Sequence, residues 1–273
     1  MTAIDAAPLW IDLEGAVNAR DVGGIPLIGG GAVASGRLLR SDNLQDLTPA
    51  DVDRLVDEHR LRAVIDLRTG VEVRLEGRGP LLDDARVVVA HHSLYPEAGE
   101  HTDALAADTI VPWQNGVHGA DMPGETPTVR TYFGYLERRP DSIVAALRTI
   151  AQPPEGGAAL VHCAAGKDRT GLVVALALEV AGADRAAVIA DYARTSERID
   201  AIVRRLAASP TYAHDMVTGD PQHHAARPES MARILALLDA RHGSPAGWLR
   251  ENGLEDEAVE TLRARLTATR SPH

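Results

Sequence analysis

The sequence predicts an α/β fold with a mostly parallel central sheet flanked by helices, and three observations support this prediction. Short apolar runs alternate with longer stretches of helical pattern, which favours parallel strands joined by helices. One apolar run, at residues 157–162, leads through a glycine-containing loop into an almost continuously apolar helix at 169–181. The chain of 273 residues is long enough for one large α/β domain, so we expect residues 1–273 to form a single domain.

The first half of the chain is expected to alternate between strands and helices. Thr48 followed by Pro49 is typical of a helix start, because threonine caps the first turn and proline is tolerated at the first helical position. This helix should run to about His59. The other elements expected here are a small hairpin at residues 31–40, strands at 62–66 and 86–92, and between these strands a short helix that carries Glu72 and Glu76.

The second half is expected to be mostly helical. It begins with a Gly/Asp/Pro-rich segment, from Ser93 to about Thr126, that is predicted to form a long loop. Gly182 follows the apolar helix, where a glycine commonly ends a helix. The elements expected are helices near 127–138 and 141–151, the strand at 157–162, helices at 169–181 and roughly 184–206, an irregular stretch at 207–226, and helices near 228–241 and 254–268.

The composition argues against several classes of function. A net charge of −11 disfavours broad binding to nucleic acid or to anionic membranes. The longest apolar stretch, at 171–178, is too short to cross a bilayer, and the first residues lack the basic start and apolar core of a signal peptide. A single cysteine rules out an internal disulfide and suits a reducing compartment, so a cytoplasmic location is expected by default.

The only cysteine and the only lysine of the chain lie close together, at Cys163 and Lys167. With Arg169 they give the pattern Cys, five residues, Arg, which is the spacing of a loop that wraps a phosphate group. The loop lies between a predicted strand and a helix N-terminus, where free backbone N–H groups and the helix dipole hold anions. The residues expected to bind phosphate are Ala164, Ala165, Gly166, Lys167, Asp168 and Arg169.

This motif predicts a nucleophile at an anion site. The loop N–H groups, the helix N-terminus and Arg169 should favour the thiolate form of Cys163. The thiolate would attack phosphorus while Arg169 holds two equatorial oxygens, and water would hydrolyse the resulting cysteinyl-phosphate. Thr170 would donate its hydroxyl to the thiolate and ease its departure. This chemistry needs no metal and no other cofactor.

The ten residues from His162 to Gly171 resemble the signature of the cysteine-dependent phosphatase superfamily. Their Gly-Lys-Asp-Arg-Thr form resembles a bacterial branch of protein-tyrosine phosphatases typified by mycobacterial protein-tyrosine phosphatase B. The resemblance runs from about residue 10 to 268, and Ala19 replaces an aromatic residue of the branch. Further matching stretches are residues 18–24, 36–41, 66–69 and 191–195.

The resemblance carries implications for substrate and architecture. Members of this branch act on phosphotyrosine, and some also act on phosphoserine, phosphothreonine and phosphoinositides. The resemblance implies a tyrosine-phosphatase-like fold with a helical lid insertion, which we expect within residues 193–240. The expected partner is a phosphorylated protein or a small phosphate ester, with no nucleic acid and no stable insertion in a membrane, and the oligomeric state stays open.

The acid that protonates the leaving group is the least determined residue. The resemblance points to the loop after the strand at 86–92, where a Pro-Asp pair is expected. Here Pro96 is followed by Glu97, so glutamate replaces aspartate and becomes the first choice. Asp168, inside the phosphate loop, is the second choice, and Asp103 is a distant third.

Other polar residues are expected to support the loop. His162 lies on the buried strand, where a structural role and a functional role are both reasonable. Asp66 and Arg68 follow a buried strand and favour an ion pair. Lys167 is expected to contact the substrate phosphate, with a solvated surface charge as the alternative. The remaining supporting candidates are Arg20 and Asp21, through packing and turn formation, and Asp191 and Tyr192, as a buried hydrogen-bonded pair behind the loop.

Three functional hypotheses follow from the sequence. The first is a phosphatase of phosphotyrosine proteins with broader activity on phosphoserine, phosphothreonine or phosphoinositides. The second uses the same chemistry on a small soluble phosphorylated metabolite. The third is a catalytically silent phosphate-binding module, which the combined presence of Cys163, Arg169 and Thr170 disfavours.

Overall fold

The computed structural model describes residues 9–95, 120–214, 216 and 220–268, and within them six strands form one sheet in the order β1-β2-β3-β6-β4-β5. The pairings of β3 with β6, β6 with β4 and β4 with β5 are parallel, whereas β2 and β1 are added antiparallel beyond β3. The strands are β1 (Leu9–Trp10), β2 (Arg20–Asp21), β3 (Leu38–Ser41), β4 (Leu61–Asp66), β5 (Val88–His91) and β6 (Ala158–His162). The predicted fold class, a mostly parallel sheet flanked by helices, is confirmed.

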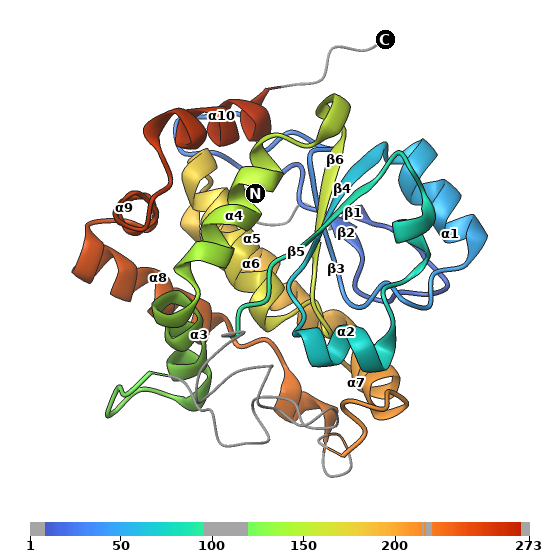
Figure 1. The fold of residues 1–273 in the computed structure, drawn as a ribbon. Helices are drawn as coiled ribbons and strands as arrows, with labels where there is room; N and C mark the ends of the chain where they lie inside the picture. Colours follow the sequence, from blue (N-terminus) through green and yellow to red (C-terminus); the bar gives the residue numbers. More distant parts are fainter. Residues whose placement is uncertain (1–8, 96–119, 215, 217–219, 269–273) are drawn as a thin grey trace.

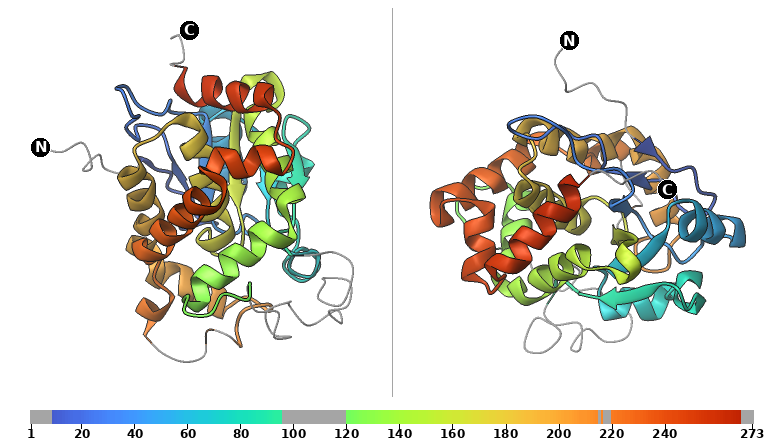
Figure 2. Two further views of the ribbon diagram at one scale, coloured as in Figure 1. Left: turned by 90° about the vertical axis from the view of Figure 1, so that its left-hand side faces the viewer. Right: turned by 90° about the horizontal axis from the view of Figure 1, so that it is seen from above.

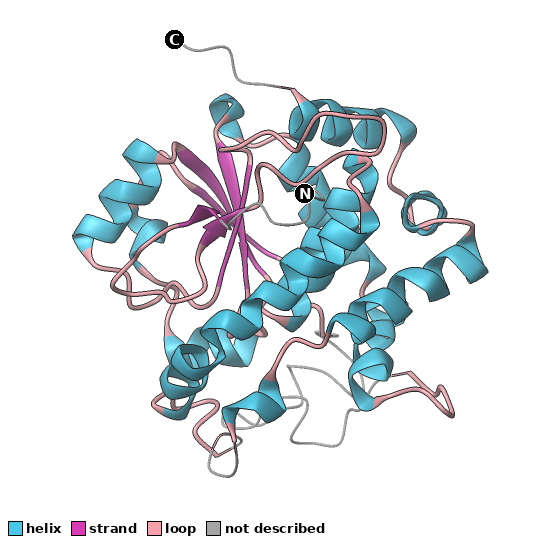
Figure 3. Ribbon diagram, turned by 180° about the vertical axis from the view of Figure 1, so that it is seen from behind, coloured by secondary structure: helices cyan, strands magenta, loops and turns pink. Residues whose placement is uncertain are grey.

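Helices lie on both faces of this sheet (Figures 1 and 3). Seen from above, the helices of residues 228–267 lie on the opposite side of the molecule from α1 (Figure 2, right). The α-helices are α1 (Pro49–Asp53), α2 (Gly70–Glu76), α3 (Pro127–Arg138), α4 (Pro140–Ala151), α5 (Asp168–Ala181), α6 (Arg185–Arg194), α7 (Ile199–Ala207), α8 (Pro228–His242), α9 (Pro245–Glu251) and α10 (Asp256–Thr267). None of the helices in the described ranges is long and apolar enough to span a bilayer.

Alternating side chains of the inner strands fill two hydrophobic cores, because successive residues of a strand face opposite sides of the sheet. Ile65 of β4 and Val161 of β6 belong to the larger core, with α3, α4, α5 and the late helices. Val64 and Leu160, one residue earlier on each strand, belong to the smaller core on the α1 side. The apolar helix predicted at 169–181 is α5, which is buried along nearly its whole length and ends at Gly182 in a left-handed conformation.

The predicted hairpin at residues 31–40 is wrong. A tight reversal occurs earlier, where Gly29, Gly30 and Gly31 all have positive φ and Pro26 bridges to Ala32. Positive φ costs glycine little, so the turn forms at this glycine run. Strand β3 begins only at Leu38 and pairs with β2 on one side and with the central strand β6 on the other. The two-residue strands β1 and β2 were not predicted.

The predicted helix at 184–206 is interrupted. Helix α6 ends at Arg194, a 3-10 turn spans Thr195–Arg198, and α7 begins at Ile199. Side chains in the turn make tertiary hydrogen bonds: Thr195 Oγ1 accepts from Arg20, and Ser196 Oγ donates to the carbonyl of Ala226. These bonds favour the break over a continuous helix.

The C-terminal region contains one helix more than predicted. Helix α9 begins at Pro245 after Ser244, whose side chain accepts a hydrogen bond from the backbone N–H of Gly247. This is the same start signal as at Thr48, where the predicted helix does form as α1 and then continues as a π-helical turn, Arg54–Glu58.

Candidate active site

The candidate active site lies at the carboxyl ends of β3, β6 and β4, where Ser41, His162 and Asp66 are aligned in adjacent strands. Ligands of open α/β sheets bind at this edge. The loop after His162 leads directly into the N-terminus of α5, so its backbone N–H groups and the helix dipole face the same region. Gly166 in this loop has φ of +66°, and a Cβ there would lie 2.4 Å from the carbonyl oxygen of Ser41. Only glycine fits this position.

A buried network behind the loop fixes its shape. The side-chain amide of Asn18 donates to the carbonyl oxygen of Ala165 at 3.0 Å, and Arg40 donates to that of Gly166 at 2.8 Å. Asp191 of α6 pairs with Arg20 at 2.9 Å and with Arg40 at 2.6 Å. Burial alone would raise the pKa of Asp191, but the two guanidinium groups outweigh it and lower the pKa to about 2.

The predicted supporting residues of this network are buried here, but Asp191 and Tyr192 do not form the expected pair with each other. Each of the two side chains is hydrogen bonded to other residues. Asp21 accepts hydrogen bonds from the backbone N–H groups of Gly23, at 2.8 Å, and Gly36, at 2.6 Å. It therefore holds a turn near the network, in agreement with its predicted role in turn formation.

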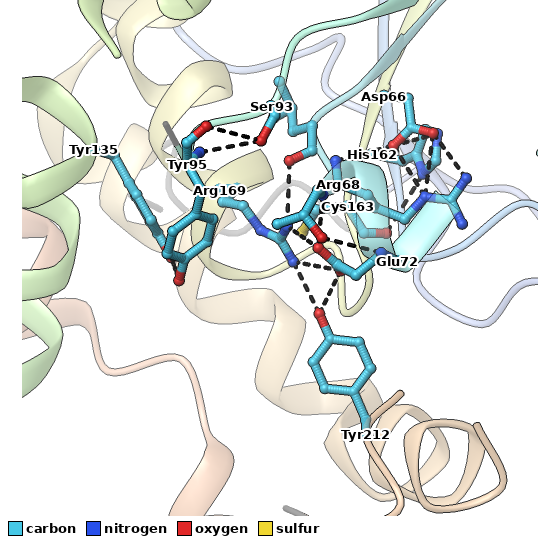
Figure 4. Close-up of polar contacts among 12 residues, drawn as sticks. Asp66, Arg68, Glu72, Ser93, Tyr95, Tyr135, His162, Cys163, Arg169 and Tyr212 are labelled. Atoms are coloured by element: carbon cyan, nitrogen blue, oxygen red, sulfur yellow. Dashed lines mark hydrogen bonds and ion pairs between the residues drawn. The ribbon is translucent and has the colours of Figure 1, made fainter. Parts of the chain in front are cut away.

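Arg169, the predicted phosphate-binding arginine, is buried and held by Glu72 of α2 (Figure 4). Its Nη1 donates to Glu72 Oε2 at 2.6 Å, and its Nη2 donates to Glu72 Oε1 at 2.9 Å. Tyr212 joins the pair: its hydroxyl accepts from Arg169 Nη2 at 3.0 Å and donates to Glu72 Oε1. Burial would lower the pKa of Arg169, but the facing carboxylate raises it well above the usual value, so the guanidinium stays charged.

Glu72 also caps the helix that carries it. It accepts the backbone N–H of Thr69 at 2.7 Å, and Thr69 Oγ1 in turn accepts the backbone N–H of Glu72 at 3.0 Å. This capping box fixes the carboxylate relative to the start of α2. Burial would raise the pKa of Glu72, yet Arg169 outweighs burial and lowers it.

His162 and Asp66 lie beside the loop, at the ends of neighbouring strands (Figure 4). Arg68 donates to Asp66 through Nε at 3.0 Å and Nη2 at 2.7 Å, so the predicted ion pair is formed. The Nε2 atom of His162 lies 3.6 Å from Asp66 Oδ1. Burial lowers the pKa of His162 to about 4, even though the nearby carboxylate opposes this shift. The imidazole is therefore neutral at pH 7.

A cavity of about 320 Å³ opens at the loop. Cys163, Lys167, Asp168 and Arg169 line it, together with aliphatic side chains of α7. These side chains are Ile199, Ile202, Val203 and Leu206. The cavity thus combines a charged loop with an apolar wall, and the wall comes from the region 193–240 in which the lid is expected.

The two charged residues at the start of α5 have partners at the cavity. Asp168 Oδ1 accepts a hydrogen bond from the hydroxyl of Tyr132 at 2.7 Å, and Tyr132 is bonded in turn to the hydroxyl of Tyr192 at 2.7 Å. Lys167 Nζ donates to the carbonyl oxygen of His224 at 2.7 Å and lies 3.7 Å from Asp168 Oδ2. The lysine is thus tied to the segment before α8 instead of being free in solvent.

The structure brings most of the predicted site residues together. Thr170 is also at the loop, but its hydroxyl is buried and forms no hydrogen bond to any residue in the described ranges, so its role towards the thiolate stays a prediction. Glu97 and Asp103 lie outside the described residues. The same described part of the chain contains no group of three or more His, Cys, Asp or Glu side chains arranged to hold a metal ion.

Three residues of the site were not predicted. The sequence places Glu72 only on a short helix, and it indicates no role for Tyr132 or Tyr212. The Thr69-x-x-Glu72 spacing is a capping signal visible in the sequence, but a second role for the same carboxylate leaves no local signature. The tyrosines come from α3 and from a turn after α7, far from the loop in sequence.

Comparisons with known proteins agree with this geometry. Residues 11–268 match the sequence profile described as the tyrosine phosphatase family. The chain is 28% identical over 278 residues to the triple specificity protein phosphatase PtpB of Mycobacterium tuberculosis, a match that covers 93% of this chain and 98% of that protein. It is also 28% identical over 242 residues to a tyrosine-protein phosphatase of Nostoc commune, covering 86% of this chain and 76% of the relative.

Proposed function

We propose, from the premise that this chain belongs to the tyrosine phosphatase family, that it hydrolyses phosphate monoesters through a cysteinyl-phosphate intermediate, with phosphotyrosine proteins as its main substrates. The observation that carries the proposal is that Cys163 and Arg169 line the same cavity, with the guanidinium of Arg169 held in place by Glu72. A nucleophile and a fixed guanidinium beside a helix N-terminus are the parts that attack on a phosphate dianion requires.

The reaction follows from these parts in two steps. The Cys163 thiolate attacks phosphorus, the ester P–O bond breaks, and the leaving oxygen takes a proton from an acid. Arg169 and the loop N–H groups stabilise the negative charge on the equatorial oxygens. Water then attacks the phosphorus of the cysteinyl-phosphate, the former acid takes a proton from this water, and the S–P bond breaks to return the thiolate and inorganic phosphate.

Asp168 is the acid that we favour. Its carboxylate lines the cavity together with Cys163, and the hydroxyl of Tyr132 orients it. Orientation by a neighbouring hydrogen bond is what a general acid needs before its proton transfer can be efficient. Glu97 is the alternative acid, on the family resemblance of the loop that contains it.

The shape of the cavity supports an aromatic phosphate ester. The loop binds the phosphate end, and the aliphatic side chains of α7, such as Ile202 and Leu206, offer an apolar wall to the ring of a phosphotyrosine. Lys167 at the cavity adds a cation for a second phosphate. It is the feature that supports broader activity on phosphoinositides, and PtpB of M. tuberculosis carries triple specificity in its name.

A substrate panel tests the proposal. Purified protein should hydrolyse p-nitrophenyl phosphate, and kcat/KM should be higher for phosphotyrosine peptides than for phosphoserine peptides, sugar phosphates or nucleotides. A preference for a soluble sugar or nucleotide phosphate would favour a metabolite phosphatase. Absence of turnover on every ester, in protein that still binds phosphate, would favour a silent binding module.

A further inference from the structure

The contact between Tyr212 and Arg169 has a consequence for substrate binding. A guanidinium group has five N–H bonds, one on Nε and two on each terminal nitrogen. Glu72 accepts one from Nη1 and one from Nη2, because its two oxygens lie 2.6 and 2.9 Å from these atoms. The second N–H of Nη1 is directed to the carbonyl oxygen of Leu67 at 3.2 Å.

The second N–H of Nη2 is the one that matters for an oxyanion. In the planar guanidinium it points in the same direction as the Nε–H, and these two parallel N–H bonds form the side that can grip two oxygens of one phosphate. The tyrosine hydroxyl oxygen takes this N–H at 3.0 Å. Tyr212, Arg169 and Cys163 all line the same cavity, so this contact is made at the site where the substrate phosphate is expected to bind.

We propose that the Tyr212 hydroxyl occupies the position of a substrate phosphate oxygen on Arg169 and must leave it before the arginine can bind phosphate through both parallel N–H bonds. Tyr212 is thus a residue that sets the affinity of the site for oxyanions. The inference rests on the proposed phosphatase function, since it takes Arg169 as the phosphate-binding group.

The surroundings of Tyr212 make such a displacement possible without loss of the Arg169–Glu72 pair. The bonds of Glu72 to Arg169 and to the Thr69 N–H do not involve Tyr212. The chain around Tyr212 is attached separately, through Ser209 Oγ and the N–H of Thr211, which both bond to Glu76 Oε1. The tyrosine ring can therefore turn away while its backbone stays anchored.

Tyr212→Phe removes the hydroxyl and keeps the ring. The dissociation constant for tungstate, a tetrahedral oxyanion, should fall by about five- to tenfold in this variant. In the wild type the anion must displace the hydrogen bond from Arg169 to the Tyr212 hydroxyl, and in the variant this bond is absent. KM for p-nitrophenyl phosphate should fall in parallel, while kcat changes by less than about threefold. Calorimetric titration and steady-state kinetics give these values, and thermal unfolding verifies that the variant is folded.

Tyr135→Phe is the matched control, because it removes a buried hydroxyl that bonds to Tyr95 and not to Arg169. Its tungstate affinity should stay within about twofold of the wild type. Equal or weaker tungstate binding by Tyr212→Phe would overturn the inference. Wild-type protein that binds tungstate but hydrolyses no phosphate ester would instead overturn the proposed function, and the comparison of tungstate affinities would still decide the role of Tyr212.

Discussion

Glu72 faces Arg169 with both carboxylate oxygens, and both side chains are buried at the base of the candidate active site. A flexible arginine would lose entropy each time it closed on a phosphate. The carboxylate removes this loss because it orients the guanidinium before substrate arrives. The pair is thus a preorganising device in a site that depends on one arginine.

Glu72→Gln tests this relationship. The amide keeps an acceptor for the Thr69 N–H but withdraws the negative charge from Arg169, so kcat/KM for p-nitrophenyl phosphate should fall about 100-fold, the loss typical of a misplaced catalytic group. Breaking a buried ion pair should also cost about 3–5 kcal/mol of unfolding free energy. Glu229→Gln, at an exposed glutamate of α8 outside the site, is the control and should keep most of the activity. Wild-type kcat/KM in Glu72→Gln would contradict the orienting role.

Cys163→Ser should abolish turnover but keep binding of tungstate, because the anion is held mostly by backbone N–H groups and Arg169.

One equivalent of iodoacetamide should inactivate the wild type, since Cys163 is the only thiol, and inorganic phosphate should slow this inactivation. EDTA should leave the activity unchanged. Full activity after quantitative alkylation would exclude a cysteinyl-phosphate intermediate.

Two variants separate the candidate acids. Asp168→Asn should slow hydrolysis of aryl phosphates with poor leaving groups far more than hydrolysis of p-nitrophenyl phosphate, because p-nitrophenolate leaves without a proton. The measurement is the dependence of kcat/KM on the pKa of the leaving phenol, which should become steeper. If Glu97→Gln gives the steeper dependence and Asp168→Asn does not, Glu97 is the acid.

Lys167→Ala should lower kcat/KM for a phosphoinositide about tenfold more than for p-nitrophenyl phosphate, because only the first substrate offers a second phosphate to the ammonium group. Lys167→Arg, which keeps the charge, should recover most of the difference. Equal losses on both substrates would reduce Lys167 to a general electrostatic role.

The unfolding free energy should depend on His162 in mildly acidic solution. The pKa of this residue is about 4 in the fold, against an ordinary value of 6.5. Below pH 6.5 the unfolded chain therefore binds a proton that the folded chain does not, so stability falls as the pH drops towards 4. The total loss is about 3 kcal/mol. Denaturant titrations should show a shallower pH dependence between 6.5 and 5 in His162→Gln. The exposed His223→Gln is the control, and a wild-type slope in His162→Gln would refute this account.

Local sequence carried the prediction of the loop and its flanking elements. Residues 157–182 hold the strand, the nucleophile, Gly166 and the helix in one uninterrupted stretch, and short-range patterns identify such units. The partners of that loop could not be predicted, because their contacts depend on the folded chain. Glu72 lies 97 residues from Arg169, and Tyr132 lies 36 residues from Asp168.

The elements that the sequence did not predict correctly either are very short or depend on contacts between distant parts of the chain. The antiparallel strands β1 and β2 have only two residues each, too few for an alternating pattern to stand out. The break between α6 and α7 depends on Arg20, whose bond to Thr195 spans 175 positions. The start of α9, in contrast, could have been predicted from the sequence. Ser244 followed by Pro245 is a helix-start signal of the same kind as Thr48 followed by Pro49.

The support of the phosphate loop by Asn18 also sets the order in which the enzyme can become active. Asn18 and Ala165 lie 147 positions apart, and Arg20 and Asp191 lie 171 apart. During synthesis the N-terminal segment leaves the ribosome long before the loop exists, and contacts of such large sequence separation form late and slowly. An incomplete chain therefore carries the cysteine without its properly shaped loop. Full activity therefore requires the N-terminal segment to pack against the phosphate loop and α6.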